Sequence, residues 1–137
     1  MNLETYSHIN NLGYEKLKMP FGTYFLFDNF FVSEILEGVH FDWNKAEIMI
    51  EKLIDFYGKD AQLGFISNRV NHYSVDPSNW TKIEHKYNLI VASAIVIYNN
   101  SNFMNASIEK QFSQKSIKRC MSLTEAIDWM AGLKEFN

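Results

Sequence analysis

Short aromatic and β-branched runs in the first third of the chain favour β-strands. Residues 23–27 (TYFLF) and 30–36 (FFVSEIL) are two such runs. Asp28-Asn29 between them predicts a two-residue hairpin turn, because both residue types tolerate a positive φ. Residues 14–19 predict a further short strand at the sheet edge, where the charged residues of this segment would oppose pairing with another chain.

Four later segments carry apolar residues every three or four positions, which indicates helices. They cover residues 43–57, about 77–87, about 103–114 and about 123–133. Asp42, Asp76 and Ser122 stand where N-caps are expected, and Ser122 with Glu125 forms a capping box in which each side chain bonds the other's backbone N–H. In the third helix we expect four apolar residues to face inward, namely Phe103, Met104, Ile108 and Phe112.

Strands alternate with these helices. Residues 63–67 (LGFIS) predict a short apolar strand, residues 89–98 (LIVASAIVIY) predict the most buried strand, and residues 117–121 predict a final short strand. Such alternation predicts parallel strands joined by right-handed crossovers, with helices covering the sheet. With the antiparallel hairpin in front, the sequence predicts an α/β fold with a mixed sheet and about four helices. Its central unit is two neighbouring parallel strands within residues 63–98, with a polar loop at the rim.

The length and composition of the chain limit the number of domains, the classes of binding partner and the cellular compartment that we expect. The 137 residues fit a single domain over residues 14–137, preceded by a loose N-terminal arm over residues 1–13. A net charge of -3 argues against non-specific nucleic-acid binding and docking on anionic membranes. With one cysteine, no signal-peptide pattern and no apolar run above ten residues, we expect a cytoplasmic protein without a membrane span.

Three stretches carry a family resemblance: TYFLFDNFFVSEILEG, GFISNRVNHYSVDPSNW and LTEAIDWM. With the element order, they resemble the SpoIIAA-like fold of STAS domains (sulphate transporter and anti-sigma-factor antagonist), and more narrowly uncharacterised bacterial STAS-like proteins with an ISNR-x-N-x-YSVDP stretch. The resemblance implies an interaction or small-ligand module without a cofactor. In the antagonist branch a serine in an Asp-Ser-Ser/Thr-Gly-type sequence is phosphorylated. This chain lacks that sequence, and Ser74 and Ser78 are the serines nearest the position.

The segment from Ser67 to Ser78 is the candidate site, because ligands of parallel sheets bind at the carboxyl ends of the strands. It is rich in hydrogen-bonding groups, and free N–H groups at the following helix start suit an anion. The alternative is that the same polar groups only stabilise the loop and cap the helix. The candidate binding residues are Asn68, Arg69, Asn71, His72, Tyr73, Ser74, Asp76 and Ser78.

The remaining residues give little indication of metal binding, of a reactive thiol or of a further binding surface. The four histidines lack metal-site spacing, so no metal is expected. Cys120 follows Lys118 and Arg119, which could lower its pKa, but we interpret it as a core thiol. The basic run Lys110, Lys115, Lys118 and Arg119 is interpreted as a solvated face, and of Tyr24, Phe30 and Phe31 we expect two in the core and one on a partner surface.

Three functional hypotheses follow. The first is a non-enzymatic STAS-like module that contacts another protein, associates with itself or senses a small ligand through residues 68–78. The second is a binding protein for a small apolar or lipid-like ligand, suggested by the 15% aromatic content. The third is an enzyme built on Arg69, His72, Tyr73 and Asp76, which requires those side chains to converge.

Overall fold

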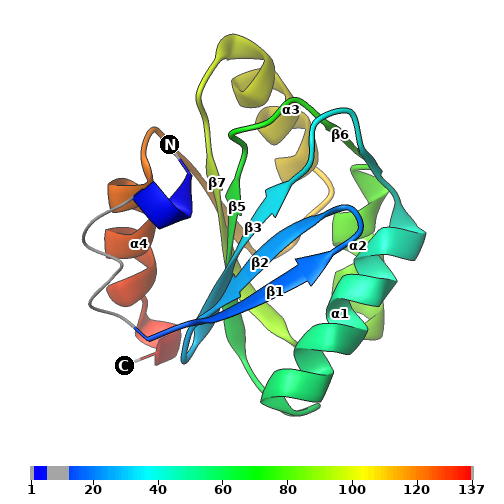
Figure 1. Cartoon of the computed structure of the whole chain (residues 1–137), viewed down its shortest axis with the longest axis vertical. Helices are drawn as coiled ribbons and strands as arrows, with labels where there is room; N and C mark the ends of the chain where they lie inside the picture. The colour runs from blue at the N-terminus through cyan, green and yellow to red at the C-terminus, as the bar shows by residue number, and fades with distance from the viewer. Residues whose placement is uncertain (1, 6–12, 137) are drawn as a thin grey trace.

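A six-stranded sheet runs through the molecule and has helices on both faces (Figure 1). The computed structural model describes residues 2–5 and 13–136. The strand order is β1-β2-β3-β5-β7-β8. The strands are β1 (Glu15–Met19), β2 (Gly22–Leu26), β3 (Phe30–Ile35), β5 (Leu63–Asn68), β7 (Ile90–Val96) and β8 (Ser116–Cys120).

The mixed pairing of the sheet confirms the predicted fold class. Strands β1, β2 and β3 pair antiparallel, and from β3 to β8 all pairs are parallel. The predicted central unit is present, since β5 and β7 are parallel neighbours with Leu63 opposite Ile90. The helix that joins them is α2 (Ser78–Lys86). The carboxyl end of β5 therefore lies at the sheet rim, where α2 begins.

The helices divide between the two faces. Residues of α1 (Trp43–Tyr57), α2 and α3 (Asn100–Lys110) belong to one apolar cluster, which we call the inner-face core. Residues of α4 (Leu123–Ala131) and Leu3 belong to the other, which we call the α4-face core. Figure 1 shows α4 and the N-terminal turn on one side of the sheet and α1 and α2 on the opposite side.

The local signals for helix starts are largely correct. Asp42 is the N-cap of α1 and accepts from the Lys45 N–H at 3.0 Å. Asp76 accepts from the Ser78 N–H at 3.0 Å but lies one position before the N-cap of α2, which is Pro77. The capping box is half right: Ser122 accepts from the Glu125 N–H, but Glu125 accepts from the Met121 N–H instead of that of Ser122. The hairpin turn at 28–29 needs no positive φ, because among the described residues only glycines have one.

The inward face predicted for the third helix is wrong. The side chains expected in the core are exposed to between 40% and 65%, namely Phe103, Met104, Ile108 and Phe112. The buried residues of α3 are Asn102, Ala106 and Glu109. They too follow helical spacing, but two of them are polar, so a search for apolar periodicity selects the opposite face of the helix.

Two very short strands are missing from the prediction. β4 (His40–Phe41) and β6 (Ser74–Val75) pair in parallel, with His40 opposite Ser74. Two residues are too few for a periodic signal. Their pairing ties the loop after β5 to the segment that leads into α1.

Several remaining predictions concern burial. Tyr24, Phe30 and Phe31 are all buried, so none of the three forms the predicted partner surface. Of the predicted loose arm, Leu3 is fully buried and its N–H donates to Glu34, whereas residues 6–12 lie outside the described residues. None of the helices in the described part of the chain has the length and apolar character to cross a membrane.

Candidate functional site

Strand alternation sends the neighbouring residues at the end of β5 to opposite faces of the sheet. Asn68 lies on the α4 face, where it donates to Glu34 at 2.8 Å and accepts from the Tyr98 hydroxyl at 2.6 Å. Ser67 and Arg69 lie on the inner face and bond to each other at 3.1 Å. The sequence grouped Asn68 with Arg69 as one candidate site, but the two side chains do not share one surface.

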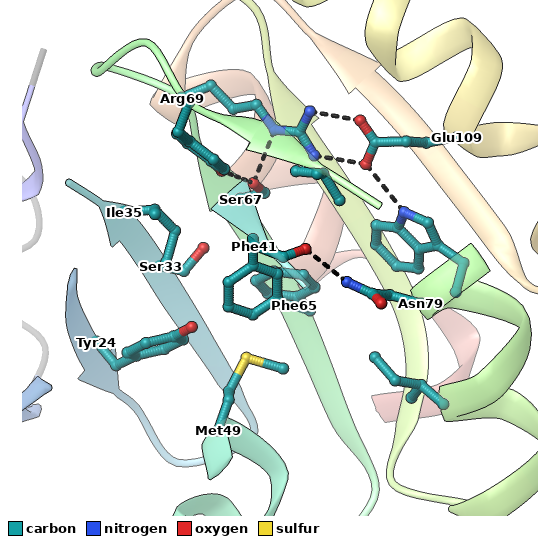
Figure 2. Close-up of a pocket in the computed structure, with 14 residues that line it drawn as sticks. Tyr24, Ser33, Ile35, Phe41, Met49, Phe65, Ser67, Arg69, Asn79 and Glu109 are labelled. Carbon is teal, nitrogen blue, oxygen red and sulfur yellow. Dashed lines mark hydrogen bonds and ion pairs between the residues drawn. The ribbon is translucent and has the colours of Figure 1, made fainter. Parts of the chain in front are cut away.

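A buried ion pair joins β5 to α3. The Arg69 guanidinium binds both carboxylate oxygens of Glu109, at 2.6 and 2.7 Å, and the Trp80 indole N–H donates to the same carboxylate at 2.9 Å (Figure 2). Burial alone lowers the pKa of Arg69, but Tyr73 and Glu109 outweigh burial and hold that pKa above its ordinary value. Arg69 therefore stays charged, and the Glu109 carboxyl group lies against its guanidinium as the counter-ion.

A cavity of about 30 Å³ lies beneath this pair, between the sheet and helices α1 and α2. Its lining is mostly apolar and includes Phe41, Met49 and Phe65, but it also holds polar groups from the sheet and from α2. Figure 2 shows Tyr24 reaching in from β2 and Asn79 from α2, on opposite sides of the space. The volume suffices for about two water molecules, or for the polar end of a small ligand.

Two polar atoms on this lining have no hydrogen-bond partner. They are the Tyr24 hydroxyl and the Asn79 Oδ1, and the two residues are 0% and 2% exposed. Burial, with a smaller contribution from Tyr73, raises the pKa of Tyr24 well above its ordinary value, so its hydroxyl keeps its proton as a donor. The Asn79 Nδ2 already donates to the Phe41 carbonyl at 2.8 Å, which leaves the amide oxygen as an acceptor. The cavity thus offers one donor and one acceptor.

An outer cleft of about 110 Å³ adjoins the cavity and shares part of its wall. The shared residues are Arg69, Tyr73, Val75 and Glu109. The half-buried Tyr73 bonds Ser67 through its hydroxyl at 3.2 Å, and its ring lies 5.7 Å from the Arg69 guanidinium carbon. Tyr73 is therefore the side chain from the loop that separates the cavity from the outside.

The other predicted site residues hold the loop in place. Asn71 donates to the Ile35 carbonyl, and the His72 N–H donates to Glu37. Ser74 bonds His40 at 2.7 Å, and Asp76 accepts from both the backbone and the hydroxyl of Ser78. These contacts match the alternative stated above, in which the polar groups stabilise the loop. Of the eight candidates, only Arg69, Tyr73 and Ser74 line the cavity or the cleft.

The catalytic arrangement required by the third hypothesis is not formed. His72 and Asp76 line neither the cavity nor the cleft, so they do not converge with Arg69 and Tyr73. Within the described residues, no three His, Cys, Asp or Glu side chains are grouped closely enough to hold a metal ion. Cys120 is buried, and burial together with Glu125 raises its pKa to about 11, which makes it a protonated core thiol.

Three residues that line the cavity were not among the predicted site residues, because contacts between distant parts of the chain bring them there. Glu109 lies 40 positions from Arg69, on the helix whose inner face was predicted wrongly. Tyr24 was considered only as an apolar ring. Asn79 follows Ser78 at the start of α2 and has no pattern that separates it from an ordinary helix-start residue.

The comparisons with known proteins concern the fold. No protein-family model matches the sequence, and no curated protein matches it. Among solved structures, the chain is similar to an uncharacterized protein from the DUF3478 family with a SpoIIAA-like fold from Shewanella loihica PV-4. The TM-score is 0.51 at 12% identity, and the match covers 87% of this chain and 93% of that chain. This likeness confirms the SpoIIAA-like fold that the sequence predicted, and at this identity it shows the fold alone.

Proposed function

We propose that this protein is a non-enzymatic module that senses a small neutral ligand at the inner cavity, entered through the cleft under Tyr73. The observation that carries the proposal is the pair of unpartnered buried atoms, the Tyr24 hydroxyl and the Asn79 Oδ1, on opposite sides of one cavity (Figure 2). Leaving such groups without a hydrogen bond costs about 1–3 kcal/mol each. A ligand that supplies the missing partners recovers that free energy on binding.

The ligand class follows from the lining. It accepts a hydrogen bond from Tyr24 and donates one to Asn79, and its small apolar part extends toward the outer cleft, because the cavity has room only for the polar end. A charged ligand is disfavoured because Arg69 and Glu109 already neutralise each other, and an unmatched buried charge is costly. A lipid chain is disfavoured too, since such ligands occupy pockets of roughly 300 Å³ or more. A primary amide is the simplest group that meets these conditions.

The test is a titration of the whole chain with acetamide, followed by ¹⁵N NMR of the Asn79 side-chain amide and the Trp80 indole. Acetone, which has the same shape but no N–H, is the matched probe. We expect acetamide to bind more tightly than acetone by about three- to tenfold, the value of one hydrogen bond.

Two variants make the test specific. Tyr24→Phe removes the unpartnered donor and should weaken acetamide binding by a similar factor. Tyr57→Phe is the matched control, because that hydroxyl lies outside the cavity and already donates to the Phe27 carbonyl at 2.5 Å. Acetamide binding that is absent at millimolar concentrations, or unchanged in Tyr24→Phe, would overturn the proposal and leave the cavity as a site for structural water.

A further inference from the structure

The outer edge of β8 is open for pairing. Strand β8 is last in the sheet, and within the described residues it pairs only with β7. The Cys120 carbonyl accepts from the Ile97 N–H at 2.7 Å, so Cys120 directs its backbone groups toward β7. Because backbone direction alternates along a strand, Ile117 and Arg119 direct their N–H and C=O groups away from the sheet. These four groups form a short template for an added strand.

An open groove of about 630 Å³ follows this edge. One wall is the end of α3 with the turn after it, β8 lies along the groove, and Trp129 of α4 stands on the other side. The groove therefore spans both faces of the strand. It shares no lining residue with the inner cavity, so it is separate from the site of the proposed function.

Positive charge is concentrated here, in a chain of net charge -3. Four cations line the groove: Lys110, Lys115, Lys118 and Arg119. Lys118 lies 3.7 Å from Glu125, and Arg119 donates to the Ser107 hydroxyl at 2.7 Å and lies over the Phe103 ring. Within the described part of the chain, no carboxylate forms an ion pair with Lys110 or Lys115.

We propose that the β8 edge and this groove bind an acidic, extended segment of a partner protein as a seventh strand. The open backbone groups supply the hydrogen bonds of strand addition, the half-buried Trp129 supplies an apolar contact, and the lysines select negative charge. A second copy of this chain is disfavoured, because antiparallel pairing of two β8 strands would bring Lys118 and Arg119 near their own copies, and like charges across strands repel.

The test uses a capped, fluorescent heptapeptide of alternating valine and glutamate with the whole chain. We expect it to bind, and we expect hydrogen exchange to slow at the Ile117 and Arg119 amides, which face the groove. The amides of Lys118 and Cys120, which face β7, should not change. The double variant Lys110→Glu/Lys115→Glu should weaken binding about tenfold, as charge reversal at an interface rim does.

Matched controls separate strand addition from charge attraction. Lys52→Glu/Lys59→Glu changes the net charge equally at exposed positions in and after α1 and should leave binding unchanged. A peptide of the same sequence with N-methylated backbone amides should bind at least tenfold more weakly, because it cannot pair. Equal binding of the methylated peptide, equal weakening by both double variants, or preference for an oligonucleotide over the peptide would each overturn the proposal. Failure of acetamide binding bears only on the inner cavity and leaves this proposal intact.

Discussion

Near the end of β5, the two faces of the sheet differ in how completely their buried polar groups are hydrogen-bonded. On the α4 face, Asn68 is bonded to Glu34 and Tyr98, and Glu34 also accepts from the Leu3 N–H at 2.6 Å. On the inner face, the Arg69–Glu109 pair is fully bonded, yet Tyr24 and Asn79 beneath it each keep one atom without a partner. Among the described residues, both of the buried side-chain polar atoms that have no partner lie on that one face.

The two faces of the sheet also differ in how closely their side chains pack. Gly64 on β5 allows α4 to approach so closely that a Cβ on Gly64 would lie 2.2 Å from the Met130 Sδ. Large side chains from α1 and α2 meet large side chains of the sheet on the inner face, and a cavity remains between them. The α4 face is therefore built for close packing, whereas the inner face keeps room and unused hydrogen-bonding capacity.

The largest effect is expected from breaking the buried ion pair on the inner face. Glu109→Leu leaves the Arg69 guanidinium buried without its carboxylate and removes the acceptor for the Trp80 indole. Removal of one partner from a buried pair costs roughly 3–5 kcal/mol. Urea denaturation of the variant and the unmodified chain measures this loss as a lower free energy of unfolding.

The double variant Arg69→Met/Glu109→Leu is the control for this prediction. It removes both charges and replaces them with apolar groups of similar size, so most of the lost stability should return. A single variant that costs less than about 1 kcal/mol, within the range of an exposed pair, would show that the pair is not desolvated as the structure describes.

A smaller loss is expected from crowding the α4 face. Gly64→Ala places a methyl group against the Met130 side chain, which is itself 1% exposed and has little room to move. Overpacking of this kind costs about 1–3 kcal/mol. Thermal or urea unfolding measures it.

Gly13→Ala is the matched control, because a Cβ at Gly13 meets nothing within 4 Å. It should leave the free energy of unfolding nearly unchanged. If Gly64→Ala is as stable as Gly13→Ala, the close approach of α4 to β5 is not a tight one, and the contrast between the two faces loses its basis.

The sequence predicted those parts of the molecule that local signals specify. The bounds of α1 were correct because a strong apolar period, an Asp42 cap and Gly58 all agree. The inner face of α3 was wrong because Asn102 and Glu109 are buried polar residues, and their apolar neighbours face outward. Arg69 was selected as a site residue, but its partner Glu109, 40 residues away, comes only from the fold.

The candidate site was harder to predict than the fold for the same reason. A polar residue after a strand has the same local pattern whether it caps a helix, fixes a loop or lines a cavity. His72 and Asp76 stabilise the loop, whereas Tyr24, on β2 and two strands away from β5 in the sheet, lines the cavity. An unpartnered hydroxyl depends on what packs around it, and no sequence spacing encodes that.

Two tyrosine substitutions, one on each face of the sheet, test whether the hydroxyl groups differ in hydrogen bonding as described. Tyr98→Phe should destabilise the chain by about 0.5–1.5 kcal/mol, because Asn68 loses a donor at 2.6 Å. Tyr24→Phe should have no cost, or a small gain, because it deletes a buried hydroxyl that has no partner. Urea denaturation of both variants in parallel gives the difference. Equal losses from the two variants would mean that the Tyr24 hydroxyl is bonded as well as that of Tyr98.

The smallest effect concerns pH and the one thiol, which lies in the α4-face core. Burial, with Glu125 adding to it, raises the pKa of Cys120 from 9.0 to about 11. Between these two values the unfolded chain releases the thiol proton and the folded chain keeps it, so the free energy of unfolding falls as the pH rises through this window. Cys120→Ala should reduce that fall slightly, which urea denaturation across the window measures.

At mildly alkaline pH a disulfide reagent should modify Cys120 much more slowly in the folded chain than in urea. Equal rates would show that Cys120 is as accessible in the folded chain as in the unfolded one, which the close packing of the α4 face around Gly64 and Met130 argues against.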